Sequence, residues 1–139
     1  MIAYFDASAF LKLVIQEAGT ERAKETWLEA RARISSRLLY PEARAGLARA
    51  RRMRRLGDGQ LEVARRSLHT LIDDADLIDV TDGLTRHAGE LAERYGLRAY
   101  DAVHLATVDR IADENTVLVA TDADLVRAAQ ARGISTSCL

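Results

Sequence analysis

The sequence has little cysteine, few aromatic residues and no long apolar run. Its single cysteine, Cys138, excludes an intrachain disulfide and a cysteine-based zinc site. It favours a reducing compartment, which we expect to be the cytoplasm. No run approaches the roughly 20 apolar residues of a membrane span, and no signal-peptide pattern is present, so we expect no membrane association. Aromatic residues make up only 5% of the chain, so alanine and aliphatic side chains must build most of the core.

Lysine is also scarce, and arginine supplies most of the positive charge. The only lysines are Lys12 and Lys24, and the net charge is −1. Residues 44–55 (RAGLARARRMRR) are strongly basic and contain no acid, whereas residues 73–82 (DDADLIDVTD) are strongly acidic. Arginine suits bidentate phosphate contacts, although a coding bias toward arginine would give the same composition.

Predicted strands alternate with one or two predicted helices along the chain. Short apolar runs predict strands over residues 2–5, 33–36, 77–80, 116–121 and 134–136. Helical spacing between glycine and proline breaks predicts helices over residues 8–17, 20–32, 41–56, 61–72, 83–95, 99–112 and 122–133. This alternation predicts a single three-layer α/β/α domain over residues 1–139, with a central, mainly parallel sheet.

Four acidic residues fall where this fold would bring them to one edge of the sheet. Asp6 and Asp122 follow the first and fourth predicted strands, and open α/β sheets bind ligands outside the carboxyl ends of their strands. Glu42 and Asp101 lie in the first turns of their helices. Each acid taken alone can equally be a helix cap or a partner of the helix dipole, and Ser8 can cap the first helix.

Carboxylates that gather in one place repel one another. The repulsion reaches roughly 4 kcal/mol for a pair about 4 Å apart near a protein surface. A divalent cation or raised pKa values would relieve it. Oxygen ligands suit Mg²⁺ and Mn²⁺, and such a site can hydrolyse phosphodiester bonds. The acids therefore favour a metal-dependent hydrolase, provided that they meet in space.

Three segments resemble the PIN-domain ribonucleases, and in particular the VapC-type toxins of VapBC toxin–antitoxin modules. The segments are YFDASAFLKL (4–13), LRAYDAVHLATV (97–108) and TVLVATDADLVRAAQARGI (116–134), with Glu42 between the first two. The resemblance covers essentially the whole chain. It implies a PIN-like fold and an endoribonuclease that hydrolyses RNA with Mg²⁺ or Mn²⁺.

The resemblance also implies roles for individual residues. Four match the catalytic acids of the family: Asp6, Glu42, Asp101 and Asp122. Three of these would be metal ligands: Asp6, Asp101 and Asp122. Three more would support the site: Ser8, Thr121 and Asp124. Many members have threonine two residues before the last acid, where this chain has Ala120, so the role of a hydroxyl in this segment stays open.

Four arginines are candidates for RNA phosphates: Arg49, Arg52, Arg55 and Arg98. The first three repeat every three residues on one predicted helix, and a solvated helix face is the alternative interpretation. The resemblance implies two protein partners, a small antitoxin that wraps the toxin and a second copy that forms a homodimer. Four apolar residues can either line an antitoxin groove or belong to the core: Phe10, Val14, Trp27 and Leu28.

Other functions remain open at this point. A PIN-like nuclease can act on DNA, or mature RNA without an antitoxin. A receiver-like signalling domain also places acids at strand ends, but it needs paired acids after the first strand and a late lysine. Here Asp6 stands alone and no lysine follows Lys24. A non-catalytic, PIN-like binding protein would not require the complete set of four acids. His104 can be a general base or a structural histidine.

Overall fold

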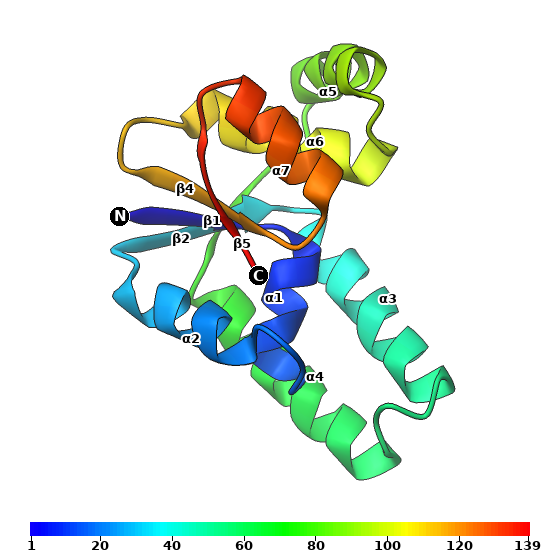
Figure 1. The fold of residues 1–139 in the computed structure, drawn as a ribbon. Coiled ribbons are helices and arrows are strands. Elements are labelled where there is room, and N and C mark those ends of the chain that lie inside the picture. Colours follow the sequence, from blue (N-terminus) through cyan, green and yellow to red (C-terminus); the bar gives the residue numbers. More distant parts are fainter.

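In the computed structural model, which describes residues 1–139, five parallel strands form one sheet in the order β3-β2-β1-β4-β5 (Figure 1). The strands are β1 (Ile2–Phe5), β2 (Ala32–Ser36), β3 (Asp76–Ile78), β4 (Thr116–Ala120) and β5 (Ser135–Cys138). The central strand is β1, where Tyr4 pairs with Ile34 of β2 and with Leu118 of β4. All of the strand pairs are parallel, so the predicted sheet is confirmed.

Helices cover both faces of this sheet. They are α1 (Ala7–Val14), α2 (Thr20–Glu29), α3 (Leu39–Arg52), α4 (Asp58–Asp73), α5 (Asp82–Tyr95), α6 (Ala99–Ile111) and α7 (Ala123–Ala131). Figure 1 shows α5, α6 and α7 above the sheet, and α1, α2 and α4 below it with α3 alongside. The three-layer α/β/α architecture is therefore the one predicted. None of the helices is both long and apolar enough to span a bilayer.

The side chains of β1 pack into two separate cores, one on each face of the sheet, because successive side chains of a strand point to opposite sides. Phe5 packs below the sheet in the core formed with α1–α4, whereas Tyr4 packs above it with α5–α7. Trp27 stands edge-on to Phe5 and Phe10, with ring centroids 5.2 and 5.7 Å apart. Phe10 and Trp27 are thus core residues, while Leu28 is 76% exposed.

Several predicted boundaries are wrong by a few residues. The first helix ends at Val14 and not at residue 17, because Ile15 takes an extended conformation. The helix predicted over 41–56 ends at Arg52, and Arg54 has a left-handed φ of 58°. Ser8 does not cap α1. The cap is Asp6, whose carboxylate accepts a hydrogen bond from the Ala9 N–H.

The strand order places a crevice between β1 and β4. From β1 the chain builds outward through β2 and β3 on one side, and it then returns to add β4 and β5 on the other. Ligands bind in open α/β sheets where the order reverses in this way, outside the carboxyl ends of the two strands. Asp6 follows β1 and Asp122 follows β4, so the fold carries both acids to this point.

Candidate active site

A cavity of about 420 Å³ lies at the carboxyl ends of β1 and β4. All four predicted catalytic acids line it: Asp6, Glu42, Asp101 and Asp122. They come from four separate parts of the chain, namely the ends of β1 and β4 and the first turns of α3 and α6. The acids therefore meet in space, which the metal-site hypothesis required. We call this cavity the acidic pocket.

Asp6 is the most buried of the four acids, with 3% of its surface exposed. Its Oδ1 accepts a hydrogen bond of 2.8 Å from the Ala9 N–H, and the Ser8 hydroxyl lies 2.8 Å from each of its oxygens. Burial raises the pKa of the Asp6 carboxyl, and the charge of Asp101 adds to this rise. Asp6 thus both caps α1 and lines the acidic pocket.

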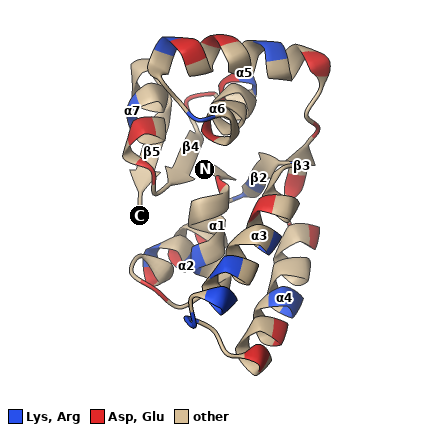
Figure 2. Cartoon of the chain, turned by 90° about the vertical axis from the view of Figure 1, so that its right-hand side faces the viewer, with Lys and Arg blue, Asp and Glu red and all other residues tan.

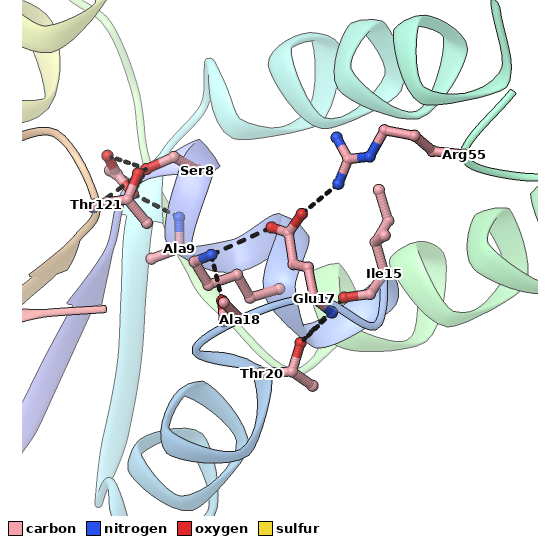
Figure 3. Close-up of polar contacts among 10 residues, drawn as sticks. Ser8, Ala9, Ile15, Glu17, Ala18, Thr20, Arg55 and Thr121 are labelled. Carbon is pink, nitrogen blue, oxygen red and sulfur yellow. Dashed lines mark hydrogen bonds and ion pairs between the residues drawn. The ribbon is translucent and has the colours of Figure 1, made fainter. Parts of the chain in front are cut away.

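Ser8 connects the ends of the two central strands. The Thr121 hydroxyl donates to Ser8 Oγ at 2.8 Å, and the Thr121 N–H lies 3.3 Å from the same oxygen (Figure 3). Ser8 in turn bonds Asp6. The hydroxyl of Thr121 therefore reaches the most buried acid through Ser8, although Ala120 stands where many family members have threonine.

Arg98 holds the two acids on the other side of the pocket. Its Nε donates to Asp101 Oδ2 at 2.9 Å, and its Nη2 lies 3.6 Å from Asp122 Oδ2. Asp122 also caps α7, accepting a hydrogen bond from the Leu125 N–H at 2.9 Å. The hydrogen bond and charge of Asp101 raise the pKa of Arg98 above its usual value. The Arg98 side chain is otherwise 76% exposed, so it can leave these acids without disturbing the core.

Glu42 is held by a buried histidine. His104 Nε2 lies 2.8 Å from Glu42 Oε1, and His104 Nδ1 lies 2.9 Å from the Tyr4 hydroxyl. Burial alone would lower the pKa of His104, but the hydrogen bond and charge of Glu42, with the charges of Asp6 and Asp101, outweigh burial and raise it. Both ring nitrogens are engaged, so His104 orients Glu42 and is placed as a structural residue.

Asp124 lies outside the acidic pocket. It pairs with Arg127 one turn along α7, and its side chain is 66% exposed. It lines a neighbouring hollow of about 280 Å³, which it shares with Arg98, Asp101 and Asp122. Asp124 therefore lies at the rim of the site, whereas Asp122 lines the acidic pocket itself.

The basic segment divides into paired and unpaired arginines. Arg55 pairs with Glu17 (Figure 3), and Arg51 donates to Asp58 at 2.6 Å. Arg49 and Arg52 are exposed, and no carboxylate lies within 4 Å of either guanidinium. Figure 2 shows the basic residues gathered along α3 and just beyond it. Two of the four predicted RNA contacts, Arg49 and Arg52, are thus free to bind phosphate.

The acidic pocket has the chemistry of a site for a hard cation. Its carboxylate donors are all oxygens, which suits Mg²⁺ and Mn²⁺. The side chains do not converge as a finished metal site, since no three acidic, histidine or cysteine residues are grouped closely enough to hold an ion. Asp101 bonds Arg98 instead, and Glu42 bonds His104. A cation would replace the charge of Arg98, so the donor set fits.

Sequence reasoning did not identify Tyr100, which also lines the acidic pocket. It is 63% exposed and directly precedes Asp101 in the first turn of α6. An exposed aromatic side chain beside a predicted catalytic acid is a signal of binding, but only the structure shows that Tyr100 is exposed.

A family model described as the PIN domain matches residues 3–131. The chain belongs to the PIN-domain family. Ribonuclease VapC45 of Mycobacterium tuberculosis is 39% identical over 132 residues, which cover 95% of this chain and 92% of that one. This PIN domain is thus of the VapC type.

Solved structures show the same fold. The crystal structure of VapC20 of M. tuberculosis, described as a toxin that cleaves the sarcin–ricin loop, has a TM-score of 0.70 at 21% identity, covering 91% of this chain and 94% of that one. VapBC2 of Rickettsia felis, bound to a promoter DNA fragment, has a TM-score of 0.65 at 15% identity, covering 100% and 99%. At these identities the likeness concerns the fold alone.

Proposed function

We propose that the chain is a metal-dependent endoribonuclease and the toxin of a type II toxin–antitoxin module. One observation carries the proposal: four acids from distant segments line one pocket at the carboxyl ends of β1 and β4. The 39% identity to a protein named as a ribonuclease supports RNA as the substrate. We also propose a cytoplasmic location, which the single cysteine, Cys138, favours.

Asp6, Asp101 and Asp122 would hold the ion, which we take to be Mg²⁺ or Mn²⁺. A bound ion lowers the pKa of a water molecule and offsets the charge that grows on the phosphate. To bind the ion, Asp101 must give up its hydrogen bond to Arg98. The Arg98 side chain is exposed, so it can move away into solvent. Asp6 needs no such movement, because Ser8 and the Ala9 N–H already fix its carboxylate.

We infer that Glu42 would orient the attacking water and take its proton. His104 holds the carboxylate through Oε1, and this leaves Oε2 for the water. Arg98, once released from Asp101, would be free to bind the scissile phosphate. The lining of one cavity would thus supply both a proton acceptor and a phosphate contact.

Two protein partners belong to this proposal. A small antitoxin would bind the toxin and block the acidic pocket, in keeping with the resemblance to VapBC toxin–antitoxin modules and the likeness in fold to VapBC2. Two copies of the chain would associate as a homodimer, as the family resemblance implies. Light scattering of the purified chain, alone and with its antitoxin, measures both assemblies.

The test is cleavage of total cellular RNA by purified, antitoxin-free protein, with Mg²⁺, with Mn²⁺ and with EDTA. We expect cuts that require metal. We also expect Asp101→Asn to slow them by more than the roughly 10- to 100-fold that loss of an outer-shell partner costs a metal site. Asp73→Asn is the matched control, since Asp73 is an exposed acid without an ion pair.

Sequencing the fragment ends would identify the cut site, and a DNA substrate run in parallel would detect a deoxyribonuclease. Folded, antitoxin-free protein that leaves RNA intact with both metals contradicts the proposal. So does cleavage that persists in EDTA.

A further inference from the structure

A second recess opens beside the acidic pocket. Its volume is about 500 Å³, which lies within the roughly 300–1,000 Å³ of small-molecule sites. Apolar side chains from α1 and α3 form its walls: Leu11, Leu38, Pro41 and Ala45. It shares four residues with the acidic pocket: Ala7, Ser8, Glu42 and Tyr100. The recess is therefore continuous with the catalytic site, and Glu42 stands on the border.

Tyr100 stands on the same border and is open to solvent. Its side chain is 63% exposed, and its hydroxyl has no hydrogen-bond partner within the chain. Neither the core nor a polar contact accounts for this ring. Every nucleobase has a face on which an aromatic ring can stack, and such stacking depends little on base identity. Tyr100 thus offers a stacking surface one residue away from the catalytic Asp101.

The wall of α3 extends from the recess into the unpaired arginines. With 3.6 residues per turn, Leu38, Ala45, Arg49 and Arg52 lie on the same side of α3 as Glu42. At 1.5 Å per residue, Arg49 and Arg52 lie about 10 and 15 Å beyond Glu42 along the helix axis. Figure 2 shows this basic stretch of α3. A strand that leaves the recess along α3 would meet positive charge.

We propose that the recess binds a nucleobase of single-stranded RNA, the base next to the scissile phosphate. Tyr100 stacks on the base, and Arg49 and Arg52 bind the phosphates that follow. This inference rests on the proposed ribonuclease function and names the residues that would hold a base beside the cut. A base inside a duplex is paired and stacked, so only an unpaired base can enter the recess.

The apolar walls alone would also suit a side chain of a protein partner. Two features favour RNA. The recess opens into the acidic pocket, where a phosphate must lie for cleavage. On α3, the helix that forms one wall, Arg49 and Arg52 lie beyond the recess, and no acid neutralises them. A nucleobase has two apolar faces and is joined through its ribose to the phosphate backbone, so it suits a recess that lies between the acidic pocket and unpaired cations.

The first test measures binding without cleavage. Fluorescent single-stranded RNA of about 12 nucleotides, of uniform A, C or U sequence, is titrated in EDTA and followed by anisotropy. Tyr100→Ala should weaken binding roughly 5- to 150-fold, the equivalent of the ~1–3 kcal/mol that stacking of one base is worth. Tyr100→Phe keeps the ring and should restore most of the affinity. Ala45→Phe fills the recess and should weaken binding as Tyr100→Ala does.

Leu28→Ala serves as the control, because Leu28 is a large apolar residue on α2 that is also exposed, at 76%. The second test uses the cut site found in cellular RNA and replaces each flanking nucleotide by an abasic one. One replacement should slow wild-type cleavage and have little further effect on Tyr100→Ala, because both remove the same contact.

The outcomes separate the two proposals. Wild-type protein that cleaves RNA, while Tyr100→Ala binds and cuts it equally well, overturns the nucleobase site and leaves a partner protein as the occupant of the recess. Equal cleavage of duplex and single strand overturns it as well. Protein that neither binds nor cleaves RNA overturns the ribonuclease function itself.

Discussion

At the scale of single residues, Arg98 is the positively charged partner of two of the pocket acids. It contacts Asp101 directly and approaches Asp122, so it occupies the carboxylates that a cation would need. A metal ion bound in the pocket would therefore compete with Arg98 for the same oxygens. The competition is weak, since Arg98 is 76% exposed and water screens its charge.

Replacing Arg98 by glutamine should raise the affinity for Mn²⁺ by roughly 1.4- to fivefold, because an exposed ion pair is worth ~0.2–1 kcal/mol. Isothermal titration of the metal-free protein measures this. The matched control is Arg37→Gln, whose guanidinium makes an ion pair of the same 2.9 Å length with Asp79, away from the pocket. Equal affinities in wild type and Arg98→Gln would show that the two cations do not compete.

Single residues also mark the limit of what the sequence could predict about the site. Asp6 and Asp122 could be found because they directly follow strands, and this position is visible in the chain order. The bond between Arg98 and Asp101 and that between His104 and Glu42 could not be found. The bond between His104 and Glu42 joins distant parts of the chain, and the three-residue spacing of Arg98 and Asp101 does not show which way either side chain turns in the pocket.

At the scale of elements, one carboxylate ties the three helices above the sheet together. Asp109 of α6 accepts hydrogen bonds from Arg132 after α7, at 2.6 Å, and pairs with His87 of α5 at 2.8 Å. Burial alone would raise the pKa of Asp109, but the bonds from Arg132 and His87 outweigh burial and lower it. The charged carboxylate is therefore the form that the folded state favours.

Asp109→Asn should lower the free energy of unfolding at neutral pH by about 1–2 kcal/mol, since hydrogen bonds to charged groups are worth more than neutral ones. A lowered folded-state pKa gives stability that is present above the unfolded value of roughly 3.9 and is lost as pH falls through the folded-state pKa. The difference between wild type and variant should therefore shrink in acid. Urea unfolding across pH measures it, and a difference that stays constant would exclude this role for the charge.

The elements below the sheet depend on the aromatic group around the only tryptophan. Phe10 of α1 is fully buried and packs edge-on against Trp27 of α2. Phe10→Ala should cost ~3–5 kcal/mol, a large share of the roughly 5–15 kcal/mol by which domains are stable. Trp27 fluorescence in urea reports the change. Phe10→Leu keeps most of the volume and should cost clearly less. Equal costs would show that the volume of Phe10 is not what stabilises this layer.

Element types were predicted better than element ends. Thr116–Ala120 is a strand with four apolar residues, and glycine ends the helices before residues 96 and 133 nearly where expected. The end of α3 could not be predicted, because the arginines that follow are good helix formers. Arg55, in the loop after α3, instead pairs with Glu17 in the loop between α1 and α2, which is a tertiary contact.

At the scale of the whole molecule, the charge is nearly balanced but unevenly placed. The net charge is −1, yet Arg49 and Arg52 stand free on one helix. Each phosphate bound by a cation releases counterions, so affinity for single strands falls with salt by a slope of about 0.7 per contact. Binding to RNA should therefore depend on these two residues at low salt.

Replacing both Arg49 and Arg52 by glutamine should reduce the salt slope of RNA binding by about 1.4. Arg51 and Arg55 are the matched pair for comparison, since Asp58 and Glu17 already neutralise them. Glutamine at those two positions should change the slope much less. Anisotropy titrations over a range of salt concentrations give both slopes. If the two double variants lower the slope equally, the unpaired arginines are not the preferred phosphate contacts.

The central position of β1 in the sheet has a consequence for when the pocket forms during synthesis on the ribosome. The ribosome makes β1 well before its neighbour β4, because the chain between Asp6 and Asp122 contains β2, β3 and most of the helices. At roughly 5–20 residues per second, several seconds separate the synthesis of Asp6 from that of Asp122. During that interval a nascent chain has no complete pocket. The acidic pocket can therefore form only after Asp122 has been made, and an antitoxin has those seconds in which to reach the chain.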